Sequence, residues 1–139
     1  MTLFKNLFRS APVKTKTIFI IENNPAYAKS LELYLSTCIK DVEEIRIFPA
    51  AELCMLELDC NPGVVIVDCL ADAGYDDSES GIELIKRLKA RKPNTNVILL
   101  SPQDEISVAV ELIKEYNCGY VKKDEHAFAK VEELIKEAW

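Results

Sequence analysis

Five polar residues with the potential for phosphoryl chemistry lie within two positions after a short apolar run: Glu22, Asn23, Asp68, Ser101 and Lys123. A carboxylate such as Asp68 can act as a nucleophile toward phosphorus. A divalent cation held by further oxygen ligands, here Glu22 and Asn23, would neutralise the transferring group. The Ser101 hydroxyl and the Lys123 ammonium would then bind the phosphoryl oxygens.

The elements that must position these residues follow from the alternation of apolar runs with segments of helical period. This alternation is typical of βαβ units around a parallel sheet. We expect helices after the cap Asn24 and after Pro49, a third after the cap Ser80, a fourth over residues 103–116, and a last one capped by Asp124. The predicted strands are residues 17–21, 43–48, 64–67, 96–100 and 118–122.

The predicted fold is an α/β, flavodoxin-like, doubly wound five-stranded parallel sheet in the order 2-1-3-4-5, with five helices. Residues 43–48 alternate charged and apolar side chains, as an edge strand does, whereas residues 64–67 are wholly apolar, as a strand covered on both faces is. In open parallel sheets, the residues that bind ligands and react lie at the carboxyl ends of the strands. The polar residues that follow every predicted strand except the edge strand at 43–48 are therefore expected to converge on one patch.

At these positions the sequence resembles the receiver domain of two-component response regulators, from about residue 16 to the C-terminus. The matching segments are IFIIENNP, VVIVDC, LLSPQD and GYVKKD. The resemblance implies that Asp68 is the phosphoacceptor and that Ser101 and Tyr120 are the switch residues. In the family the switch aromatic lies three residues before the site lysine, which implies Lys123 rather than Lys122. Glu22, Asn23, Asp68 and the backbone carbonyl of Leu70 would hold Mg²⁺.

The sequence also departs from the family pattern around the implied metal site. Asn23 stands where the family usually has a second carboxylate, and its neutral amide oxygen is a weaker ligand for a hard cation. The sequence therefore leaves two alternatives for Mg²⁺ at this site: weakened binding and no binding. The Met-Pro turn after the phosphoacceptor is missing, and a longer loop precedes Gly81. Pro102 and Asp124 replace the usual residues after Ser101 and Lys123. The loop either supplies a replacement carboxylate or is a solvated surface; its acidic residues are Asp72, Asp76, Asp77 and Glu79.

The resemblance implies a stand-alone receiver that is not an enzyme. A histidine kinase or histidine phosphotransfer protein would donate the phosphoryl group. Output would pass to a protein partner through the fourth helix, the fifth strand and the last helix, since no effector follows Trp139. The alternative is a pseudo-receiver that acts as a protein-interaction module without phosphorylation. A small flavodoxin-like enzyme is disfavoured because the chain has no GxGxxG motif.

Composition limits the remaining classes of function. The 139 residues suffice for one domain, which we place at residues 16–139 after a tail or short helix at 1–15. A net charge of -6 argues against broad nucleic-acid binding. No apolar run approaches the roughly 20 residues of a membrane span. Five scattered cysteines without a CxxC motif indicate reduced thiols and a cytoplasmic location. A homodimer is left open.

Overall fold

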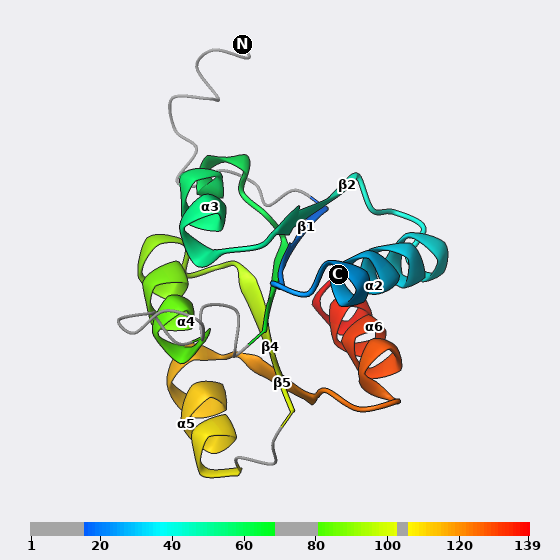
Figure 1. The fold of residues 1–139 in the computed structure, drawn as a ribbon. Helices are drawn as coiled ribbons and strands as arrows, with labels where there is room; N and C mark the ends of the chain where they lie inside the picture. The colour runs from blue at the N-terminus through cyan, green and yellow to red at the C-terminus, as the bar shows by residue number, and fades with distance from the viewer. Residues whose placement is uncertain (1–15, 69–80, 103–105) are drawn as a thin grey trace.

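The structure is a computed structural model, and it describes residues 16–68, 81–102 and 106–139. Strands and helices alternate along the chain (Figure 1). The elements are β1 (Thr17–Ile21), α2 (Pro25–Cys38), β2 (Glu44–Phe48), α3 (Ala51–Leu56), the 3-10 helix η1 (Leu58–Cys60), β3 (Val64–Asp68), α4 (Gly81–Arg91), β4 (Asn96–Ser101), α5 (Ile106–Tyr116), β5 (Gly119–Lys122) and α6 (Ala127–Ala138).

The five strands form one parallel sheet in the order β2-β1-β3-β4-β5. The predicted flavodoxin-like fold with five α-helices is therefore confirmed. The register aligns the carboxyl ends of the strands, because Ile21 pairs with both Phe48 and Val67. Farther along the sheet, Asp68 pairs with Leu100. The residues that end β1, β3, β4 and β5 consequently meet at one edge.

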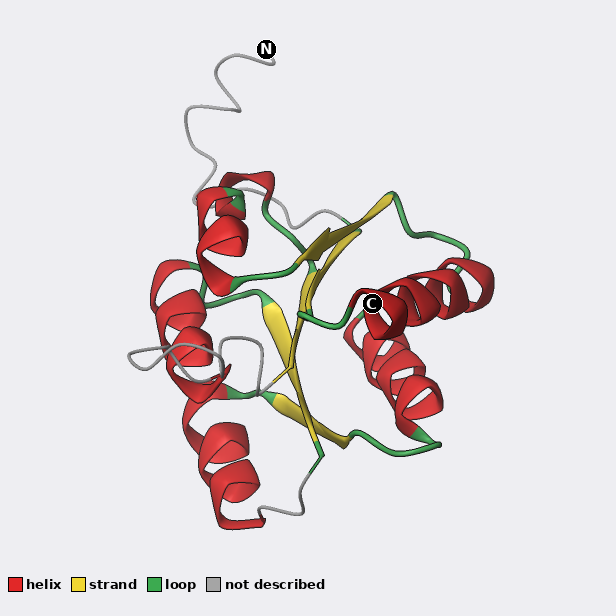
Figure 2. Cartoon of the chain, in the orientation of Figure 1, coloured by secondary structure: helices red, strands yellow, loops and turns green. Residues whose placement is uncertain are grey.

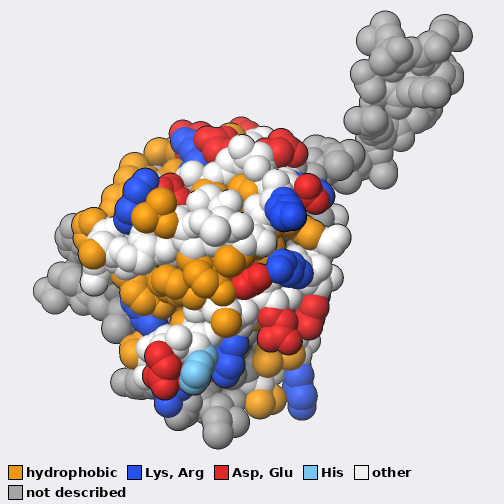
Figure 3. Space-filling view, turned by 90° about the vertical axis from the view of Figure 1, so that its right-hand side faces the viewer, with side chains coloured by type: hydrophobic (Ala, Val, Ile, Leu, Met, Phe, Trp, Pro, Cys, Tyr) orange, Lys and Arg blue, Asp and Glu red, His pale blue; other side chains and the backbone are white. Residues whose placement is uncertain are grey.

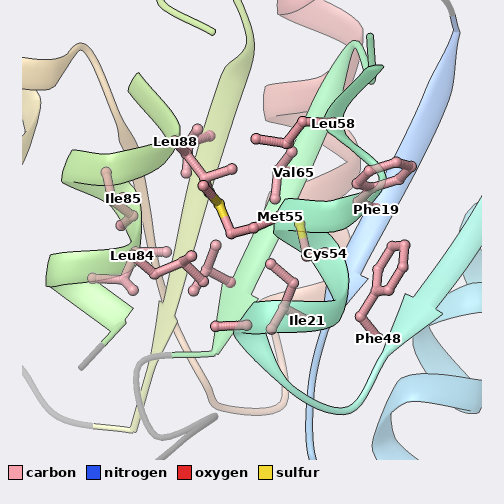
Figure 4. Packing of buried hydrophobic residues seen from close by; sticks show 14 of the residues in the cluster. Phe19, Ile21, Phe48, Cys54, Met55, Leu58, Val65, Leu84, Ile85 and Leu88 are labelled. Carbon is pink, nitrogen blue, oxygen red and sulfur yellow. The ribbon is translucent and has the colours of Figure 1, made fainter. Parts of the chain in front are cut away.

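Helices cover both faces of the sheet, with α2 and α6 on one face and α3, α4 and α5 on the other (Figures 1 and 2). Alternate residues of each strand point to opposite faces, so each central strand contributes to two cores. Phe19, Val65 and Leu99 pack with α3 and α4 in the first core (Figure 4). Ile18, Ile66 and Ile98 pack with α2 and α6 in the second. All five residues of β3 are buried, as the sequence predicts for a strand covered on both faces.

The beginning of α2 follows the sequence prediction closely. The Asn24 side chain accepts hydrogen bonds from the backbone N–H groups of Ala26 and Tyr27, at 3.1 and 3.2 Å. Pro25 occupies the first turn, where its missing N–H costs no helical hydrogen bond. The direction of the chain after β1 is thereby fixed next to the predicted site.

The prediction for the start of the last helix differs from the structure. Asp124 does not cap the last helix, because α6 begins at Ala127 after His126. The Asp124 carboxylate instead accepts from the His126 N–H at 2.9 Å, which closes a turn before the helix. In the segment after Pro49, Leu53 and Leu56 are 46% and 78% exposed, whereas Leu58 is fully buried.

Several sequence predictions lie outside the described residues: the tail at 1–15, Leu70, the acidic loop residues and the predicted Ser80 cap. Within the described ranges, no helix combines the length and the apolar stretch that crossing a membrane requires.

Candidate functional site

The carboxyl edge of the sheet brings together Glu22, Asp68, Ser101 and Lys123, as the sequence predicts from parallel strand ends. Glu22 directly follows β1, Asp68 ends β3 and Ser101 ends β4. These three residues are buried, with exposed fractions of 2%, 2% and 4%. Lys123 follows β5, and its backbone N–H donates to the Ser101 carbonyl oxygen at 2.7 Å.

The Lys123 ammonium joins the two buried carboxylates. Its Nζ lies 3.1 and 3.2 Å from the two carboxylate oxygens of Glu22 and 3.3 Å from Oδ2 of Asp68. The Lys123 side chain is only 20% exposed, so solvent screens these ion pairs weakly. Without the ammonium, two carboxylates would face each other in a poorly solvated site, which is costly.

The carboxylate of Glu22 has a strongly raised pKa. Burial, followed by the adjacent Asp68 carboxylate, raises the pKa of Glu22 from 4.5 to about 7, against the opposing effect of Lys123. The backbone N–H of Asn24 also donates to Glu22 Oε1 at 3.2 Å. Near neutral pH the cluster can therefore exchange a proton at Glu22, and any cation that favours the ionised form would displace that proton.

Asn23 lies next to Glu22 and is exposed. Within the described ranges, no group of three or more His, Cys, Asp or Glu side chains is arranged to hold a metal ion. Mg²⁺ nevertheless needs only one or two protein carboxylates when water and phosphate supply its other ligands. Glu22 and Asp68 meet that need, with the Asn23 amide as a neutral neighbour. The chemistry of this donor set therefore fits Mg²⁺, although Lys123 already neutralises part of its charge.

The two predicted switch residues lie on adjacent strands beside this cluster. Ser101 is buried at the end of β4, and Tyr120 is half-buried in β5, packed against the first core. Lys122 pairs in register with Ser101, whereas the Lys123 ammonium contacts the carboxylates. The Leu70 carbonyl and the acidic loop are not among the described residues, so their predicted contact with a metal stays a prediction.

The structure also places Tyr27 at the site, a residue that the motifs in the sequence do not mark. The Lys123 Nζ lies 4.2 Å from the centroid of the Tyr27 ring. This contact joins the first turn of α2 to the residue after β5. An aromatic residue just after the cap of the helix that follows β1 is the sequence signal, but its partner is distant along the chain.

Comparisons with known proteins match the chain to one family. The family model described as the response regulator receiver domain matches residues 18–136. No curated protein matches the chain.

Solved structures with the same fold share little sequence with this chain. The RcsB response regulator of Salmonella typhimurium superposes with a TM-score of 0.74 at 19% identity, over 89% of this chain and 59% of that chain. The isolated REC domain of RcsB from Salmonella enterica serovar Typhimurium, with phosphomimetic BeF3⁻, gives 0.72 at 19% identity, over 89% and 90%. DrrB of Thermotoga maritima gives 0.69 at 19% identity, over 90% and 52%. The chain thus spans less than two thirds of that first RcsB chain and about half of the DrrB chain.

Proposed function

The chain belongs to the response regulator receiver domain family of two-component signalling, and we propose that it accepts a phosphoryl group on Asp68. The donor would be a histidine kinase or a histidine phosphotransfer protein. One observation carries the proposal: the buried Asp68 carboxylate lies at a strand end, 3.3 Å from the Lys123 ammonium. This arrangement pairs a nucleophile with a cation that can follow the charge as it moves to the phosphoryl oxygens.

In the proposed reaction, an Asp68 carboxylate oxygen attacks phosphorus, and an O–P bond forms as the bond to the donor's leaving group breaks. The Lys123 ammonium already lies between Asp68 and Glu22, so it can pair with a phosphoryl oxygen after a small movement. The Ser101 hydroxyl ends the neighbouring strand and would donate a hydrogen bond to the same group. When bound by Glu22, Asp68 and Asn23, Mg²⁺ would supply further neutralisation of phosphoryl charge.

Output is proposed to pass through the face formed by α5, β5 and α6. Movement of Ser101 would be transmitted to Tyr120, which is half-buried in β5. Val110 and Ile113 of α5 are 44% and 52% exposed, which gives this face apolar side chains for a protein partner or a second copy of the chain. We propose that the domain signals to that partner rather than catalysing a reaction on a substrate. A cytoplasmic location is part of the proposal, because five scattered cysteines without a CxxC motif are typical of reduced thiols.

A second candidate, a pseudo-receiver that binds its partner without phosphorylation, is supported by the same ion pairs. Because Lys123 contacts both carboxylates, their charge is already partly neutralised without a metal ion. Asn23 also removes one expected carboxylate. In this case partner affinity would be unchanged by Asp68→Asn, and Mg²⁺ would bind weakly.

Incubation with acetyl phosphate and Mg²⁺, followed by intact-mass measurement, separates these functions. Phosphoacceptance predicts a gain of one phosphoryl group in the wild type and none in Asp68→Asn. Asp59→Asn is the matched control, because Asp59 is exposed in η1. The absence of a mass gain in the wild type, or an equal gain in Asp68→Asn, would contradict phosphorylation at Asp68.

A further inference from the structure

The Lys123 ammonium is held from two sides by different kinds of group. Carboxylate oxygens of Glu22 and Asp68 lie within 3.1 to 3.3 Å of Nζ. The centroid of the Tyr27 ring lies 4.2 Å from the same atom, well within the distance of a cation–π interaction. An aromatic face attracts a cation without using any of its three N–H donors in a conventional hydrogen bond. Those donors therefore stay available to oxygen atoms.

The Tyr27 ring is itself fixed by its surroundings. The backbone N–H of Tyr27 donates to the Asn24 side chain at 3.2 Å, which anchors the first turn of α2. On the side of α6, the ring packs edge-on against Phe128, with centroids 5.4 Å apart and the planes at 74°. Phe128 in turn contacts Tyr34, with centroids 5.5 Å apart. The ring thus packs between Lys123 and Phe128 of α6.

We propose that Tyr27 is a positioning residue of the receiver site, whose ring holds the Lys123 ammonium between Glu22 and Asp68. The lysine side chain is long and flexible, and the carboxylates alone allow it several arrangements. The ring restricts the ammonium to the position between the two acids, from which it can reach a phosphoryl oxygen. The effect on phosphoryl transfer rests on the proposed function of Asp68, whereas the placement of Lys123 does not.

The aromatic ring, rather than the phenol hydroxyl, carries this role. The Tyr27 Oη is buried and finds no hydrogen-bond partner among the described residues. Burial, followed by the Glu22, Asp68 and Asp124 charges, raises the pKa of Tyr27 to about 12, so the hydroxyl stays neutral at physiological pH. Phenylalanine keeps the ring face and removes only the unpaired oxygen. Tyr27→Phe should therefore preserve the contact, whereas a non-aromatic side chain should remove it.

The test compares Tyr27→Phe with Tyr27→Leu and Tyr27→Met, using the full chain labelled with ¹³C-lysine. Tyr34→Leu is the matched control, because Tyr34 lies on the same helix and also contacts Phe128. The first readout is the NMR shift of the Lys123 Hε protons, which lie next to the charged nitrogen and respond to the ring current. It needs neither Mg²⁺ nor a phosphoryl donor. The second readout is the rate of phosphorylation by acetyl phosphate.

The wild type and Tyr27→Phe are expected to share an upfield Lys123 Hε shift, which Tyr27→Leu and Tyr27→Met lose and Tyr34→Leu keeps. The phosphorylation rate should fall about threefold to tenfold in the two non-aromatic variants, from the usual size of a cation–π contact. The proposal is overturned if the shift survives in a folded Tyr27→Leu or Tyr27→Met protein, or if Tyr34→Leu loses it equally. If Tyr27→Leu and Tyr27→Met lose the shift but no protein, including the wild type, is phosphorylated, the positioning role of Tyr27 is supported. Only the proposal that Asp68 accepts a phosphoryl group is then rejected.

Discussion

The proton on Glu22 couples the site to pH, because this side chain is buried beside a second carboxylate. Its pKa in the folded chain, about 7, lies above the ordinary value of 4.5. Between these values the folded protein keeps a proton that the unfolded chain releases. The contribution of neutral Glu22 to stability is therefore complete below pH 4.5 and is lost as the pH rises through about 7.

We predict that the free energy of unfolding falls by about 2 kcal/mol between pH 5 and pH 8 through this group. The measurement is urea unfolding across that range in the presence of EDTA. Glu22→Gln should remove this part of the pH dependence, because glutamine resembles the protonated acid in shape and charge. Glu133→Gln, at an exposed position of α6, should leave the dependence intact. Parallel pH profiles for the wild type and Glu22→Gln would contradict the prediction.

Among the elements, the first turn of α2 has the closest connection to the site. The Asn24 cap joins the Glu22 carboxylate, through its own N–H, to the turn that carries Tyr27. We predict that Asn24→Ala lowers the free energy of unfolding by about 1 kcal/mol, because two N–H groups lose their acceptor. Asn24→Ser should restore most of this loss. Urea unfolding at one fixed pH measures both effects.

A control within the same helix separates capping from general helix damage. Ser36 Oγ donates to the Leu33 carbonyl on the exposed side of α2, far from the cap. Ser36→Ala should therefore change stability much less than Asn24→Ala. If the two variants lose equal free energies of unfolding, Asn24 contributes no more than any other residue of α2, and its capping hydrogen bonds do not fix the chain between β1 and α2.

The elements differ in how far the sequence could predict them. The central strands were predictable because four of the five residues in each of β1 and β3 are apolar, and their parallel order follows from the βαβ alternation. The cap at Asn24 was also predictable, from local chemistry. The start of α6 was not predictable, because an Asp such as Asp124 can either cap a helix or close a turn, and the local sequence does not distinguish the two. Leu56 ends the short α3 and is exposed, which its apolar side chain alone does not indicate.

The candidate site shows the same division between local and distant causes. Glu22, Asp68, Ser101 and Lys123 meet because parallel strands align their carboxyl ends, and topology predicts this. The Tyr27 contact depends on how α2 packs against α6 across the second core, which local sequence does not encode. Figure 3 shows the face of the molecule on which α2 and α6 lie, where a band of apolar side chains lies between charged ones.

For the molecule as a whole, the site and the two cores are joined through one sheet. The strands that carry Glu22 and Asp68 also contribute the central residues of both hydrophobic clusters. A ligand that binds only the folded arrangement of these carboxylates must therefore stabilise the entire domain, by mass action. The net charge of -6 would also attract cations generally, so a specific effect has to be separated from screening.

We predict that Mg²⁺ at about ten times its dissociation constant raises the free energy of unfolding by about 1.4 kcal/mol. The response should grow as the pH rises through about 7, because Mg²⁺ binding must displace the proton of Glu22. Asn23→Asp should increase the response by adding a carboxylate ligand, and Asp68→Asn should remove it. Thermal unfolding with Mg²⁺, against NaCl at the same ionic strength, measures these differences. If Asp68→Asn responds as strongly as the wild type, Mg²⁺ acts on the overall negative charge, and the carboxylates at the strand ends do not form a cation site.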